Sequence, residues 1–144
     1  QDKEEQTVGF ILNVEGTELG VETIQTVKFA VDTPDGTNAK TTDVAVTATI
    51  RGKILTMLDE GSEASMDLAK WAMVTSDNAD CYRNVTVKSL AAGQVVREYT
   101  FTKAFVIDYK EDYDDKEGIG TFTLIIRQKK DKIKDATVTG GYAG

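Results

Sequence analysis

The fold is decided by residues 95–109, VVREYTFTKAFVIDY, and by the segment that returns from them, residues 120–126, GTFTLII. Both segments are rich in β-branched and aromatic residues, and polar and apolar side chains alternate along them, which predicts two long antiparallel strands. The acidic stretch between them, residues 108–117, predicts the loop of a hairpin. A hairpin of this length has more edge than the core of a small domain requires, and an exposed strand edge favours pairing with another chain.

The remaining segments predict a mainly β chain. Turn residues at 16–20 and 33–36 separate alternating segments, and Pro34 followed by Gly36 is the strongest turn signal. Further strands are predicted at residues 6–15, 21–32, 43–54 and 82–90, with a short one at 136–139. We therefore expect two packed antiparallel sheets, as a sandwich or small barrel, in one domain over residues 1–144 with flexible ends at about 1–5 and 140–144.

Residues 62–75, SEASMDLAKWAMVT, change the apolar period from two to 3.6 and predict the one substantial helix. Leu68 and Trp71 fall on one side of this helix, and Met66 and Met73 fall on the other. A helix that is apolar over most of its circumference is usually buried on more than one side. We expect it to pack on its own sheets and also against a neighbouring subunit.

The composition excludes several classes of site. The chain has 144 residues, a net charge of −7, no histidine, and Cys81 as its one cysteine. These counts rule out a His-dependent catalytic triad or dyad, an intrachain disulfide and a tetrahedral zinc site. The acidity argues against non-specific binding to nucleic acid, and no apolar run is long enough to span a bilayer. We predict no enzymatic activity, no cofactor and no metal, with Cys81 packed as a small hydrophobe; whether a leader precedes Gln1 stays open.

Two segments of opposite charge flank the return strand. Residues 108–117 carry six acids and two lysines, whereas residues 127–134 carry five bases and one acid. An EF-hand is disfavoured because Lys116 and Glu117 stand where an oxygen ligand and a glycine are required, and a hydrolytic carboxylate pair would need an apolar cleft. A solvated hairpin tip and a charged strand end that resists aggregation are the simple interpretations. Alternatively, the two segments attract each other between stacked copies of the chain.

The order of elements resembles the tube-forming fold of phage tail-tube proteins and of the haemolysin-coregulated (Hcp) tube protein of type VI secretion. The likeness lies in the mid-chain helix at 62–75, the long strand at 99–109 and the return strand at 120–129. It spans most of the chain as an architecture. The resemblance implies two packed sheets with the helix against one side, a hexameric ring, rings stacked into a hollow tube, and no catalytic residues.

Function is then mechanical. The resemblance implies a subunit of the inner tube of a phage tail, a phage-derived particle or a contractile injection or secretion system, with residues 33–42 contacting the next ring. It makes sheath or baseplate proteins possible partners and assigns no specific nucleic-acid or membrane binding. The chain is expected in the cytoplasm before assembly and then in a virion, a tail-like particle or a secretion apparatus. Its source system, ring size and cargo stay open.

Two other functions compete with the tube subunit. A β-sandwich binding module would need an exposed aromatic platform, whereas Tyr99, Phe101, Phe105 and Tyr109 are predicted to share one strand face and to form core. A hydrolase, which is less favoured, would need a Ser-Lys or aspartyl mechanism, and no motif supports one. For the tube subunit, the predicted interface residues are Trp71, Met66, Met73, Asp112, Asp114, Asp115, Lys129, Lys130 and Lys132.

Overall fold

The computed structural model describes residues 8–32, 45–54, 60–115, 119–128 and 137–140. Its elements are β1 (Val8–Val14), β2 (Thr17–Leu19), β3 (Ile24–Asp32), β4 (Ala45–Ile54), α2 (Glu60–Ala72), the 3-10 turn η2 (Ala79–Cys81), β5 (Arg83–Ala91), β6 (Gln94–Asp114), β7 (Ile119–Gln128) and β8 (Thr137–Gly140). The predicted mainly β fold with one substantial mid-chain helix is confirmed.

The strands form one hydrogen-bonded sheet that folds over on itself. Its order is β2-β1-β5-β6-β7-β4-β3, and β8 also pairs with β6. The first part of β6 pairs with β5 and β8, and residues 104–114 of β6 pair with β7. We call β2, β1, β5, β8 and the first part of β6 the first half-sheet. The second half-sheet consists of β3, β4, β7 and residues 104–114 of β6.

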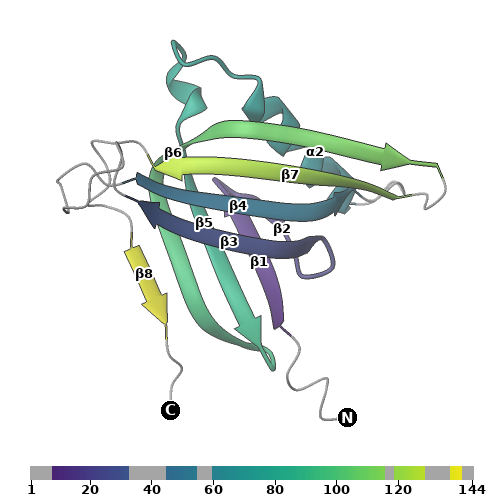
Figure 1. Ribbon diagram of the computed structural model, residues 1–144, viewed down its shortest axis with the longest axis vertical. Coiled ribbons are helices and arrows are strands. Elements are labelled where there is room, and N and C mark those ends of the chain that lie inside the picture. The colour runs from purple at the N-terminus through teal and green to yellow at the C-terminus, as the bar shows by residue number, and fades with distance from the viewer. Residues whose placement is uncertain (1–7, 33–44, 55–59, 116–118, 129–136, 141–144) are drawn as a thin grey trace.

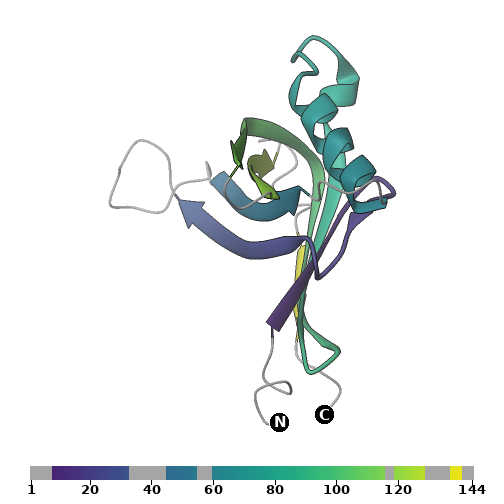
Figure 2. The same ribbon diagram turned by 90° about the vertical axis from the view of Figure 1, so that its right-hand side faces the viewer.

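The two half-sheets are the two layers that the sequence predicts, joined through β6. Figure 1 shows β3, β4, β7 and the end of β6 running across the molecule, while β1 and β5 run steeply. Figure 2 shows β6 rising from the β5–β6 turn and bending over, with α2 at the end of the molecule opposite that turn. A strand that passes from one layer to the other is a recognised way to turn the corner of a small barrel.

Two β-bulges in β6 produce this bend. Val85 pairs with Phe101 but Arg83 pairs with Ala104, so β6 holds one extra residue in this interval. Lys103 there has φ +65°, and its N–H donates to the Asn84 side chain at 3.1 Å. The second extra residue lies between Val106 and Asp108. Each bulge moves the side chains that follow it to the opposite face of the strand.

The bulges correct one prediction. Phe101 is buried and Tyr99 and Tyr109 pack against the core, but Phe105 is outside this cluster and meets the Tyr82 ring edge-on, with ring centroids 6.0 Å apart. The four aromatic residues therefore do not share one face. Strict alternation fails because Ala104 and Val106, and not Phe105, face the core after the first bulge.

Two loop predictions are also corrected. Residues 16–20 contain the short strand β2, which is joined to β1 by a two-residue turn at Glu15 and Gly16, with φ of +47° and +96°. Residues 108–117 are not all loop, because β6 continues to Asp114, which pairs with Ile119. The acidic side chains up to that point therefore lie on a strand.

The core lies between the half-sheets and is closed by α2. Leu68 and Trp71 of α2 pack with Leu12, Val85, Val87, Ile50, Phe122, Leu124 and Ile126. The Trp71 indole N–H donates to the carbonyl of Cys81 at 2.9 Å, and the Arg83 guanidinium lies 5.7 Å from the Trp71 ring centroid. Cys81 is buried, as the sequence predicts.

Candidate assembly surface

The second half-sheet has two unpaired edges. Within the described residues, no strand pairs with β3 on the side away from β4, or with residues 105–114 of β6 on the side away from β7. Successive strands are antiparallel, so β3 and β6 run in opposite directions at the two edges. Long unpaired edges offer rows of backbone N–H and C=O groups to another chain.

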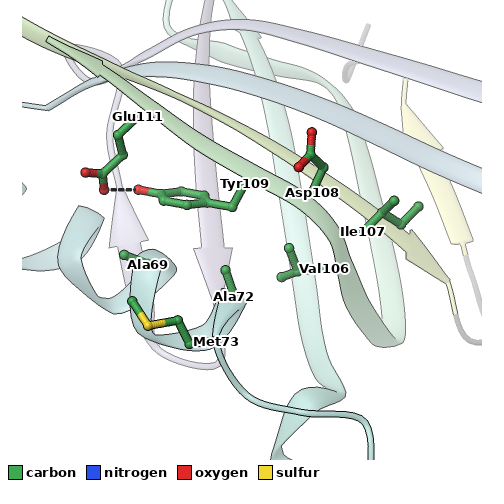
Figure 3. A pocket seen from close by; sticks show the side chains of 8 residues that line it. All are labelled: Ala69, Ala72, Met73, Val106, Ile107, Asp108, Tyr109 and Glu111. Atoms are coloured by element: carbon green, nitrogen blue, oxygen red, sulfur yellow. Dashed lines mark hydrogen bonds between the residues drawn. The ribbon is translucent and has the colours of Figure 1, made fainter.

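An open groove of about 530 Å³ lies along the β6 edge, between that strand and α2. On the helix side it is lined by Ala69, Ala72 and Met73, and on the strand side by Val106, Ile107, Asp108, Tyr109 and Glu111 (Figure 3). The Met73 residue is 76% exposed and the bulged Ile107 is 41% exposed. Large apolar side chains this exposed beside a free strand edge mark a surface that gains stability from being covered.

A hydrogen-bonded trio stiffens the far end of the β6 edge. The hydroxyls of Tyr109 and Tyr113 both donate to the Glu111 carboxylate, at 2.5 and 2.8 Å. Burial, followed by this hydrogen bond, raises the pKa of Tyr109, and the hydrogen bond chiefly raises the pKa of Tyr113. The Tyr113 ring lies over Gly120 on β7, where an added Cβ would come within 2.5 Å of the ring. The trio holds an exposed, charged strand end in a fixed shape.

The face of the second half-sheet that points away from the core is polar. Cross-strand pairing places threonines and charged residues together on this outward face, because residues directly opposite each other share a face. Among the side chains that the structure describes, its bases are Lys28, Arg51, Lys53, Lys110 and Arg127, its acids are Asp108, Asp112 and Asp114, and its threonines include Thr26, Thr47, Thr49, Thr121 and Thr123.

The predicted interface residues fall in different places. Trp71 is 1% exposed, so it is an anchor of the subunit's own core. Met66 on α2 and Met73, just after α2, are both exposed. Asp112 and Asp114 are exposed on β6, and Asp115 is exposed just after it. Lys129, Lys130 and Lys132, and the loop residues 33–42, lie outside the described residues.

Sequence reasoning missed the groove and the outward face. Both depend on the bulge at Ile107, which decides which side chains of β6 point at α2, and no residue type in this stretch signals a bulge. The available signal is the sequence FVIDYKEDYD at 105–114, where an apolar run continues into a segment that mixes tyrosines with acids.

The described part of the chain contains no group of three or more acidic or thiol side chains placed to hold a metal ion. No helix in the described ranges has the length and apolarity that crossing a membrane requires.

Comparison with solved structures shows the fold. The chain is similar to Hcp1 from Flavobacterium johnsoniae, with a TM-score of 0.60 and 19% identity over 94% of this chain and 98% of that one. It is also similar to a chain of the sheath-tube complex of the extracellular contractile injection system PVC, with a TM-score of 0.59 and 11% identity over 92% and 89% of the two chains. Hcp1 from Salmonella typhimurium gives a TM-score of 0.56 at 14% identity over 83% and 80%.

Comparison with curated proteins finds no match. A family profile, in contrast, covers nearly the whole chain: the family described as Hemolysin coregulated protein Hcp (TssD) matches residues 12–140. The matched range begins in β1 and ends in β8, so it includes both half-sheets and the helix between them. This chain belongs to the Hcp (TssD) family.

Proposed function

We propose that this protein is the structural subunit of a hollow tube, built from six-membered rings in which the β3 edge of one copy pairs with the β6 edge of the next. The observation that carries the proposal is the second half-sheet, which has a free edge on each side among the residues that the structure describes. Membership of the Hcp family and the similarity to a chain of a sheath-tube complex support it.

The strand directions favour a head-to-tail ring. Four strands of alternating direction leave β3 and β6 antiparallel, so β3 of one copy meets β6 of the next as an antiparallel pair and the pattern continues around the ring. A contact between two different surfaces of this kind closes into a ring when its rotation divides a full turn.

The charges favour the same arrangement. Asp108, Asp112 and Asp114 outnumber Lys110 on the outward face along the β6 edge, whereas Lys28 lies on that face along β3. Two β6 edges brought together would join two surfaces of net negative charge, which is destabilising, but β3 beside β6 brings Lys28 to the predominantly acidic edge. Head-to-tail pairing is therefore selected over a symmetric dimer.

The groove beside the β6 edge fits the same contact. Once the next copy's β3 lies along β6, its core-side residues come over the groove between β6 and α2, where Met73 and Ile107 are exposed. Val31, near the end of β3, is 61% exposed and supplies an apolar side chain on that side of the strand. The joint then buries apolar surface from both copies in addition to the backbone hydrogen bonds.

The size of the closed ring follows from strand spacing. Six copies would contribute twenty-four strands about 4.8 Å apart, which gives a barrel about 37 Å wide before strand tilt widens it. The bulk of each copy, its first half-sheet and α2, lies on the core side of the second half-sheet. The first half-sheet and α2 of six copies fit outside such a barrel but not inside it. The outward face of the second half-sheet would therefore line the bore.

Stacking of rings uses the two ends of the barrel. The acidic end of β6, with Asp112, Asp114 and Asp115, lies at the end where β7 begins, and β7 then leads to Gln128 at the other end. The basic segment 127–134 follows from there in sequence. Opposite charges at opposite rims would attract each ring to the next and set its polarity.

We further propose that the protein has no enzymatic activity and assembles from a cytoplasmic pool into a secretion apparatus or phage-like particle, with sheath or baseplate proteins as partners. The binding-module alternative has little support, because Tyr99, Phe101 and Tyr109 pack on or in the core.

The test is light scattering on concentrated protein, with electron microscopy of the same sample. Six-membered rings or stacked tubes are expected, and a strictly monomeric species at high concentration would contradict the proposal. Stacking is tested by changing Lys129, Lys130 and Lys132 together to Glu, which should leave single rings and shorten tubes at low salt. Tubes of unchanged length would exclude the charge pairing between rims.

A further inference from the structure

One end of the first half-sheet projects beyond β3. This projecting end consists of β8, residues 94–100 of β6, residues 86–91 of β5 and residues 8–13 of β1, which pair with one another. It meets the second half-sheet where Phe29 of β3 stacks on Tyr99 of β6, with ring centroids 3.5 Å apart. Figures 1 and 2 show β6 extending from there past β3 to the β5–β6 turn. The residues between Tyr99 and that turn therefore lie beyond the β3 edge.

The inner face of the projecting end, which continues the core side of the first half-sheet, carries a base among apolar side chains. Arg97 shares a cross-strand row with Phe10, and Val138 opposes Tyr99 in the next row. Phe10 and Tyr99 pack against the core, but Val138 is 58% exposed, and Val8, two residues before Phe10 on β1, is 55% exposed. Such a face favours a partner that presents apolar surface together with an acid.

The Arg97 side chain is available to such a partner. Arg97 is exposed, and the structure gives its guanidinium no hydrogen-bond or ion-pair partner among the residues that it describes. In contrast, Arg83, on the same face at the other end of β5, binds the Asp80 carboxylate at 2.7 Å. A guanidinium presents its donors in a planar fork that matches a carboxylate able to accept two of them.

The β6 edge, on the other side of the subunit, presents such a carboxylate. Glu111 opposes the buried Phe122 of β7, so its side chain is on the core side of β6, where it lines the groove beside α2 (Figure 3). Its two oxygens each accept one hydrogen bond, from the hydroxyls of Tyr109 and Tyr113. A carboxylate has about four lone-pair sites, so about two are left for an incoming cation. The two tyrosines fix the direction in which those sites point.

We propose that Arg97 of each copy binds Glu111 of the next copy, and that the inner face of the projecting end covers the groove between β6 and α2; the inference rests on the proposed function, which brings these two sides of neighbouring copies together. The exposed valines of the projecting end then pack near Met73 and Ile107, the exposed apolar residues of the groove. Apolar side chains on both surfaces exclude water from the ion pair, which strengthens the attraction.

The occupant of the groove is a second copy because the two complementary surfaces belong to opposite sides of one chain. The projecting end supplies a base and the groove supplies an acid, and both supply exposed apolar side chains. A head-to-tail contact joins base to acid at every joint of a ring, whereas a symmetric contact would set Glu111 against Glu111 or Arg97 against Arg97. The ion pair therefore determines which orientation of the next copy is accepted.

The experiment is a double-mutant cycle on ring formation, read as the midpoint concentration in light scattering or sedimentation. Arg97→Glu and Glu111→Arg should each raise the midpoint about tenfold, because each change sets like charges against each other at every joint. The double variant restores opposite charges and should return the midpoint to within about threefold of wild type. Urea denaturation checks that each monomer stays folded.

Two further comparisons make the result specific. Arg97→Gln and Glu111→Gln, singly and together, repeat the cycle without reversing a charge, and they decide the question if a reversed variant does not fold. The control variant combines Lys88→Glu with Glu98→Lys. It exchanges two charges that oppose each other on the outer face of the projecting end, so it should leave the midpoint unchanged.

Losses at Arg97 and Glu111 that simply add would overturn the inference, because Glu111 would then act only on the shape of its own strand end. The inference also fails if wild-type rings form and neither single change moves the midpoint, or if the control raises it as much. In those cases the strand-paired ring still stands. A wild-type protein that forms no rings overturns the proposed function, and this inference with it.

Discussion

Changing Met73 to Asp should separate assembly from folding. Met73 follows α2, is 76% exposed and lines the groove beside the β6 edge, so its loss removes little from the subunit's own core. Fully burying a methionine side chain stabilises by about 1.5–3 kcal/mol, so covering the exposed three-quarters contributes about 1–2 kcal/mol to each contact between copies. Asp at this position also adds a negative charge to a groove that Glu111 already lines.

The expected result is a rise of about five- to thirtyfold in the concentration at which rings form, since about 1.4 kcal/mol corresponds to a factor of ten. Sedimentation or light scattering over a concentration series measures that midpoint, and urea denaturation checks that the monomer is as stable as wild type. Val95→Asp, at a 38% exposed position beside the β5–β6 turn, is the matched control and should assemble normally. Normal assembly of Met73→Asp, or equal impairment of the control, would refute the assignment of the groove to the ring contact.

Three other outcomes follow from the contacts. Lys28→Glu should weaken ring formation, and adding Asp108→Lys should restore it, as light scattering on the single and double variants would reveal; additive losses would contradict pairing across the β3–β6 joint. Gly52→Ala should lower the free energy of unfolding by about 1–3 kcal/mol in urea titrations, because the new Cβ would lie 2.6 Å from the Phe122 ring. Because the folded pKa of Tyr109 is raised above its ordinary 10.0, stability should fall as pH rises beyond 10, and Tyr109→Phe should reduce that fall; an unchanged pH profile would count against it.

The sequence predicts the elements whose periodicity is strong. The change of period at residues 62–75 indicates α2, and the apolar residues that recur at 68 and 71 are the ones that reach the core. Glycine at position 16 indicates a tight turn, where φ is +96°. These features are local, so one sequence contains enough information to find them.

Features that depend on distant pairing are missed. Aspartate and lysine are poor strand formers, so residues 108–114 are expected in a loop, yet β7 provides a partner for each of them and holds them in β6. The bulges at Lys103 and Ile107 follow from how β5 and β7 each align with β6, and neither alignment is visible within the strand itself. The bulges decide where the groove and the outward face lie. Neither surface can therefore be predicted from the sequence of β6 alone.

The passage of β6 through both half-sheets has a mechanical consequence. The backbone of β6 crosses from the second half-sheet, which is the inner layer of the proposed tube wall, to the first half-sheet, which is the outer layer. Force applied to the lining during ejection would therefore reach the outside through covalent backbone, and not only through the softer contacts between packed side chains. Sliding one layer over the other would require the two kinks in this shared strand to straighten, so the wall should resist shear as one piece.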